Sequence, residues 1–93
     1  MRASSETLSA DVVVTLPRDV DLHARPAANF VRAAMAFSAD IWVAVGEREV
    51  DAKSLLSVLA LGAKGGTNLR LRAQGANAVA AVDALATTVA ELR

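Results

Sequence analysis

Four short stretches of the chain either alternate apolar and polar residues or are rich in β-branched residues, and both patterns predict β-strands. They are residues 10–16, 39–45, 48–50 and 68–73. Pro17 stops the first stretch, and Gly46 with its neighbour Glu47 predicts a hairpin tip between the second and the third. In the fourth stretch Arg70 and Arg72 alternate with apolar residues, so one face of the sheet is expected to contact water.

Three further stretches repeat apolar residues at intervals of three and four, which is typical of amphipathic helices. They are residues 26–35, 55–61 and 78–92. Pro26 fits a first helical turn, where its missing N–H costs nothing. Ser54 and Asn77 are candidate N-caps, and Gly62 is expected to end the second helix. The predicted buried stripes are Ala27, Phe30, Val31 and Ala34 in the first helix, and Val79, Val82, Leu85, Ala86, Val89 and Leu92 in the last.

The predicted elements follow the order βαββαβα. Strands with one polar face and helices with one apolar stripe pack as two layers. We therefore expect an α+β fold in which a four-stranded antiparallel sheet carries three helices on one face. Residues 10–93 are expected to form a single domain, preceded by a flexible tail at residues 1–9, which are mostly small and polar.

Composition excludes several classes of protein. Ten basic residues balance ten acidic ones among 93, so no positive surplus favours nucleic acid or an anionic membrane. Cysteine is absent and His23 is the single histidine, which excludes disulfides, thiolate zinc sites and multi-histidine metal sites. No apolar run approaches the roughly 18 residues of a membrane span, and no secretory signal is present. A cytoplasmic monomer without metal or organic cofactor is the resulting expectation.

The most informative segment is the hexapeptide Leu22-His23-Ala24-Arg25-Pro26-Ala27, which places a histidine immediately before a predicted helix. A helix start exposes unpaired N–H groups and the positive end of the helix dipole. Arg25 adds a guanidinium suited to phosphate oxygens, and an imidazole can accept and release a phosphoryl group. These residues predict a phosphoryl-acceptor site at His23. From position alone, a surface histidine and a solvated arginine remain an equal alternative.

The same hexapeptide resembles the active-site signature of HPr, the histidine-containing phosphocarrier family of the bacterial phosphoenolpyruvate-dependent sugar phosphotransferase system. The resemblance continues through Ala52-Lys53-Ser54-Leu55-Leu56 and covers the chain from about residue 10 to its end. It implies an open-faced β-sandwich and a relay protein that is not itself an enzyme. It also implies that His23 takes phosphate on Nδ1 from phosphorylated enzyme I and passes it to enzyme IIA. Arg25 and the backbone N–H of Ala24 would then hold the phosphate.

By the same resemblance, partner proteins dock on the helix that follows His23 and on the short helix after Ser54. The implied docking residues are Ala28, Arg32, Leu55, Leu56 and Leu59. Three leucines on one short helix cannot easily all be buried, so an exposed apolar patch is expected there. For Leu59 a purely structural role in the core is an equal alternative.

Ser54 is a candidate regulatory site, because some bacteria phosphorylate the serine of this motif with HPr kinase/phosphorylase. The alternative function is a regulatory HPr-like module, either a serine-phosphorylated corepressor or a carrier for nitrogen or dihydroxyacetone signalling. Two residues depart from the family pattern: Asp21 and Ser57 each stand where glycine is usual. A carboxylate at Asp21 close to His23 would repel a phosphoryl dianion, so Asp21→Gly is predicted to raise the level of phosphohistidine.

The remaining charged and aromatic residues predict no further chemistry. Arg70 and Arg72 are expected to pair with Asp11, Asp40 or Glu49 across the sheet. Trp42 is expected to lie on a sheet face or edge. No aromatic cluster accompanies the arginines, as a nucleic-acid stacking surface would require.

Overall fold

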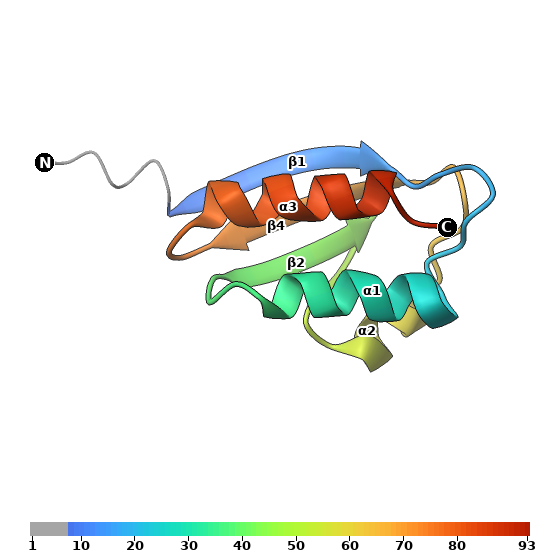
Figure 1. The fold of residues 1–93 in the computed structure, drawn as a ribbon, viewed down its shortest axis with the longest axis horizontal. Helices are drawn as coiled ribbons and strands as arrows, with labels where there is room; N and C mark the ends of the chain where they lie inside the picture. Colours follow the sequence, from blue (N-terminus) through green and yellow to red (C-terminus); the bar gives the residue numbers. More distant parts are fainter. Residues whose placement is uncertain (1–7) are drawn as a thin grey trace, which may run out of the picture.

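The computed structural model describes residues 8–93, and its elements follow the predicted order βαββαβα (Figure 1). The strands are β1 (Ser9–Thr15), β2 (Asp40–Val45), β3 (Arg48–Asp51) and β4 (Asn68–Gln74), and the helices are α1 (Ala24–Met35), α2 (Leu55–Leu61) and α3 (Ala78–Ala90). The four strands form one antiparallel sheet in the order β1-β4-β2-β3. All three helices lie on one side of it (Figure 1). The α+β open-faced sandwich is therefore confirmed.

The register of the sheet follows from the alternation in β4, which is the partner of both β1 and β2. Leu69, Leu71 and Ala73 point to the helices and are fully buried, whereas Arg70 is exposed on the opposite face. A shift of one residue would reverse these faces and bury the arginines. The alternation predicted from the sequence thus fixes which face is covered.

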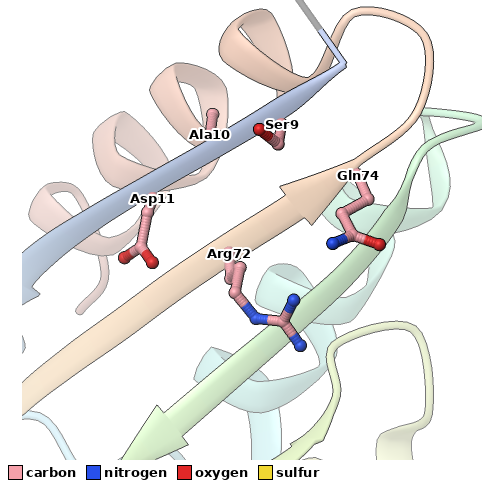
Figure 2. Close-up of a pocket in the computed structure, with 5 residues that line it drawn as sticks. All are labelled: Ser9, Ala10, Asp11, Arg72 and Gln74. Carbon is pink, nitrogen blue, oxygen red and sulfur yellow. The ribbon is translucent and has the colours of Figure 1, made fainter.

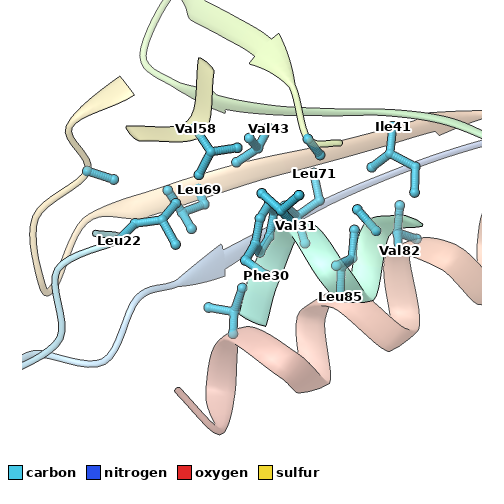
Figure 3. Close-up of a cluster of buried hydrophobic side chains, with 14 of the residues drawn as sticks. Leu22, Phe30, Val31, Ile41, Val43, Val58, Leu69, Leu71, Val82 and Leu85 are labelled. Atoms are coloured by element: carbon cyan, nitrogen blue, oxygen red, sulfur yellow. The ribbon is translucent and has the colours of Figure 1, made fainter. Parts of the chain in front are cut away.

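The core lies between the sheet and the helices (Figure 3). Phe30 on α1 is fully buried, and it is the largest fully buried side chain. All four residues of the predicted α1 stripe are buried. Alanine is frequent in the core, including Ala27, Ala34 and Ala73. Such small side chains allow helices to approach the sheet closely, while valine and leucine fill the remaining space.

Two predicted helix caps are confirmed at α2. The Ser54 hydroxyl accepts a hydrogen bond from the Ser57 N–H at 3.2 Å. Gly62 ends the helix in the left-handed conformation, with φ of 67°. Asn77 does occupy the N-cap position of α3, but with φ of 62° and without a side-chain cap bond. Its contribution is therefore its tolerance of left-handed backbone geometry.

Two details of the sequence prediction are corrected. Val79 was expected in the buried stripe of α3, yet it is 43% exposed. The buried residues of this helix are instead Ala78, Ala81, Val82, Leu85 and Val89, a stripe from which Val79 is rotated away. Ser9, assigned to the tail, belongs to β1 and pairs with Gln74. Leu8 of the predicted tail precedes the strand and is 50% exposed, and residues 1–7 lie outside the described residues. No helix of residues 8–93 is long and apolar enough to cross a membrane.

Candidate functional site

His23 is the N-cap residue of α1 and is exposed. Its backbone is extended, with φ of −146° and ψ of 162°, and its side chain makes no cap hydrogen bond. The backbone N–H of His23 donates to the Asp21 carbonyl at 2.8 Å. The imidazole is thus presented at the start of the helix, where the helix itself makes no use of its nitrogens.

Ala24 and Arg25 contribute two backbone N–H groups that have no partner within the helix. They are the first residues of α1, and the earliest helical bond is donated by Ala27 to the His23 carbonyl at 3.4 Å. Pro26, which follows Arg25, has no N–H to offer. These donors lie at the positive end of the helix dipole, which is a favourable environment for an anion.

Ala24 also has an unusual backbone conformation that the sequence pattern did not indicate. Its φ is 49°, in the left-handed region that alanine seldom adopts. Among residues 8–93, Asn77 is the other non-glycine residue with positive φ. Asp21, which replaces the family's usual glycine, does not share this conformation, so glycine's conformational freedom is not required there.

Arg25 and Arg32 are both exposed and lie about two turns apart on α1. The Arg32 guanidinium donates to the Asn29 side chain at 3.1 Å. Arg25 has no ion-pair or hydrogen-bond partner for its side chain among residues 8–93. Its guanidinium therefore keeps its full capacity for an external anion.

A hollow of about 230 Å³ lies beside His23. It is lined by Asp21, Leu22, His23, Gly62, Ala63 and Lys64. The far wall comes from the loop between α2 and β4, for which the sequence predicts no functional role. Two charged residues, Asp21 and Lys64, line this hollow although they are 43 positions apart in the chain, because backbone hydrogen bonds join the two loops.

Exposed apolar side chains of α1 and α2 lie close to the predicted docking residues and include two of them, Leu55 and Leu56. Leu56 is 80% exposed and Leu55 is 41% exposed, which confirms that the leucines of α2 are not all buried. Leu59 is half-buried and packs against the core, so its structural alternative holds. Met35, 65% exposed, extends the surface and was not anticipated. A groove of about 360 Å³ runs between the helices, lined by Ala28, Val31, Arg32, Met35, Lys53 and Leu55.

Lys53 fixes the geometry of this groove. Its ammonium donates to the Phe37 carbonyl just beyond the end of α1 at 2.6 Å. Its N–H donates to the Asp51 carboxylate at 2.8 Å, and the next residue, Ser54, caps α2. Lys53 therefore links the end of α1 to the start of α2.

The open face of the sheet contains the larger hollow, about 410 Å³, between β1 and β4 (Figure 2). Its charges are satisfied internally. Arg70 donates to Asp11 from Nε at 3.0 Å, and Arg72 donates to Glu49 from Nη2 at 2.9 Å. The Arg72 guanidinium also lies 4.2 Å from the centre of the Trp42 ring. Two of the predicted pairings are thereby confirmed, while Asp40 pairs with neither arginine.

These bonds shift the acidity of both carboxylates. The hydrogen bond from Arg70 lowers the pKa of Asp11, and the hydrogen bond from Arg72 lowers the pKa of Glu49. Because every charged group here has a partner, this larger hollow offers less to a charged ligand than the smaller one at His23. Residues 8–93 contain no group of three or more potential metal-ligating side chains.

An open-faced βαββαβα sandwich that presents a histidine at the start of its first helix defines the class of HPr-like carriers. The family model for the PTS HPr component phosphorylation site matches residues 9–91. The phosphocarrier protein HPr of Streptomyces coelicolor is 46% identical over 71 residues, covering 75% of this chain and 76% of its own. HPr of Vibrio cholerae is 39% identical over 79 residues, covering 85% and 93%.

A solved structure gives the same result. The crystal structure of HPr from Bacillus anthracis superposes with a TM-score of 0.83 at 33% identity, covering 87% of this chain and 96% of that one. The chain therefore belongs to the HPr family of phosphocarrier proteins of the phosphotransferase system.

Proposed function

We propose that this protein carries phosphoryl groups on Nδ1 of His23, taking them from phosphorylated enzyme I and passing them to enzyme IIA. The observation that supports this best is the state of His23 itself. Its imidazole is exposed and makes no cap bond, and it stands beside two N–H groups that no helical partner uses. A group that must receive and release an anion needs such unused donors nearby.

The transfer is a displacement at phosphorus. The lone pair of His23 Nδ1 forms the new bond to phosphorus, while the bond from phosphorus to the donor's atom breaks and its electron pair stays with the donor. The N–H groups of Ala24 and Arg25 and the Arg25 guanidinium are suited to the negative oxygens during this exchange. Passage to enzyme IIA repeats the step with His23 as the leaving group.

Both partners would dock on the apolar surface formed by α1 and α2. Leu55, Leu56 and Met35 provide exposed apolar area, and Arg32 lies at its edge. Such a small surface favours complexes that form and dissociate quickly, as a relay requires. Enzyme I and enzyme IIA would use it in turn.

The test is incubation of the purified protein with enzyme I and phosphoenolpyruvate, followed by intact-mass measurement and phosphorus NMR. We expect one acid-labile phosphate on the wild-type protein and none on His23→Ala. Ser57→Ala, on the neighbouring α2 helix, is the matched control and should still accept phosphate. Absence of phosphate on the wild type with a competent enzyme I would contradict the proposed function.

We further propose that phosphorylation of Ser54 would regulate docking. Ser54 is the N-cap residue of α2, and the next residue, Leu55, lines the groove between α1 and α2. A phosphate there would place negative charge beside an apolar surface and weaken partner binding. Incubation with HPr kinase/phosphorylase and intact-mass measurement tests this, with Ser54→Ala as control. An unchanged wild-type mass under activating conditions would contradict it.

A further inference from the structure

Asp21 makes a side-chain contact that the family's usual glycine could not make. Its Oδ1 accepts a hydrogen bond from the Gly65 N–H at 2.9 Å, across 44 positions of sequence. The adjacent Leu22 N–H donates to the Ala63 carbonyl at 2.9 Å. These two bonds lie on either side of Lys64, which lines the hollow beside His23.

The loop that carries Lys64 depends on these anchors. Farther along it, the Gly66 N–H donates to the Leu16 carbonyl at 3.0 Å. A Cβ at Gly65 would lie 2.1 Å from the Arg18 carbonyl oxygen, so residue 65 is pressed against the opposite loop and must be glycine. The Asp21 carboxylate accepts the hydrogen bond of the Gly65 N–H, and Asp21 itself lines the hollow beside His23.

We propose that Asp21 is a positioning residue of the phosphoryl site, which holds Lys64 beside His23 through its bond to Gly65. The effect on transfer rests on the proposed phosphocarrier function. Repulsion of an incoming phosphoryl dianion is the only effect of Asp21 that the sequence indicates, and it alone leads to the predicted gain for Asp21→Gly. The bond to Gly65 reverses that expectation. By anchoring the loop it also fixes a cation in the wall of the same hollow, and this attraction offsets the repulsion.

The anchor and the charge of Asp21 can be separated by two substitutions. Asp21→Asn removes the charge but keeps an oxygen that can accept from Gly65, whereas Asp21→Ala removes both. We expect the rate of transfer from enzyme I, measured as kcat/KM, to fall about fivefold in Asp21→Ala and to stay within about twofold of wild type in Asp21→Asn. Asp19→Ala, which removes an exposed carboxylate two positions earlier, is the matched control and should leave the rate unchanged.

A double-mutant cycle tests whether Asp21 acts through Lys64. Lys64→Gln alone should slow transfer by a similar factor, about fivefold. If Asp21 works by placing Lys64, adding Asp21→Ala to Lys64→Gln should cost little more than either change alone. Multiplicative effects of the two changes would overturn the proposal, as would a rate for Asp21→Asn as low as that of Asp21→Ala. Faster transfer in both Asp21 variants would show that repulsion dominates and would also overturn it.

Hydrogen exchange at the Gly65 amide tests the anchor without any phosphoryl transfer. Exchange should be about tenfold faster in Asp21→Ala than in the wild type, and close to wild type in Asp21→Asn. Equal exchange in wild type and Asp21→Ala would overturn the anchor. If the wild type accepted no phosphate at all, the proposed function would fail while this measurement still judged the anchor.

Discussion

Arg70 and Arg72 on the open face of the sheet are paired with carboxylates of the chain, whereas Arg25 and His23 at the start of α1 have no such partner. Arg70 and Arg72 each bind a carboxylate from another strand. Arg25 has no side-chain partner among the described residues, and the imidazole of His23 makes no cap bond. Arginine is therefore paired within the chain in one region and left unpaired in the other.

This difference separates stability from function. A guanidinium bound to a carboxylate of its own chain must lose that bond before it can hold a ligand. An unpaired guanidinium beside free N–H groups needs only to exchange water for the anion, so it responds to a passing phosphoryl group at low cost. The size of the hollow is a poorer guide, because the larger one lies on the paired face.

The largest expected effect comes from removing one arginine from each region, Arg25 at the start of α1 or Arg70 on the sheet. We expect Arg25→Ala to lower kcat/KM for transfer from enzyme I by about 30-fold, because the transition state loses a charge-assisted contact. Arg70→Ala should leave transfer unchanged. Single-turnover kinetics with phosphorylated enzyme I measure both. Comparable losses in the two variants would show that pairing within the chain does not decide which arginine acts in transfer.

The second test compares exposed apolar residues on the two faces. Leu56 on α2 is 80% exposed and Val13 on β1 is 61% exposed. Leu56→Ser should raise KM for enzyme I about tenfold with little change in the free energy of unfolding, because docking loses buried apolar area. Val13→Ser should leave KM unchanged. Steady-state kinetics, together with urea unfolding of both variants, distinguish docking from stability, and a matching rise in KM for Val13→Ser would place a docking surface on the sheet.

Much of the fold could be predicted because its faces follow a period along the chain. The alternation around Arg70 and Arg72 placed those arginines on the open face, and the spacing of Phe30 and its neighbours marked the buried face of α1. Val79 was misplaced because valine alone does not show where a helical stripe begins. On α3 the position of a residue around the helix predicted its burial better than its hydrophobicity, since Ala78 and Ala81 are buried and Val79 is exposed.

The candidate site could be predicted only where it is local in sequence. His23, Ala24 and Arg25 lie in one hexapeptide, which both chemistry and family resemblance identify. Lys64 and the contact of Asp21 could not be found this way, because two loops without any period meet there through backbone hydrogen bonds. The left-handed conformation of Ala24 was equally hidden, since alanine is not a residue that signals it.

The third test compares Ala24, the strained residue at the start of α1, with an alanine inside a regular helix. Ala24→Gly should raise the free energy of unfolding by about 0.5 kcal/mol, because relief of left-handed strain exceeds the entropy gained by the unfolded chain. Ala84→Gly, in the middle of α3, should lower it by about 1 kcal/mol. Urea unfolding of both variants gives the two signs. Destabilisation by both would mean that the start of α1 stores no strain.

The smallest effect concerns the paired face and its response to acid. Arginine hydrogen bonds lower the pKa of Asp11 and of Glu49 below their ordinary values of 3.8 and 4.5. A carboxylate whose pKa is lower in the folded state stabilises the fold fully above its unfolded pKa, and this contribution disappears as the pH falls through the folded value. Both carboxylates are well solvated, so the contribution is small and is weakened further by salt.

Asp11→Asn should therefore melt slightly below the wild type at pH 7 and low salt, and the two melting temperatures should converge as the pH falls below 3.8. Asp19→Asn, an exposed carboxylate on the loop after β1, is the matched control and should track the wild type across the whole range. Thermal unfolding followed by circular dichroism at several pH values measures the difference. If the difference in melting temperature persisted in acid, packing of the Asp11 side chain and not its pairing with Arg70 would be the source of the stabilisation. The paired arginines of the sheet would then stabilise the fold no more than the unpaired Arg25 does.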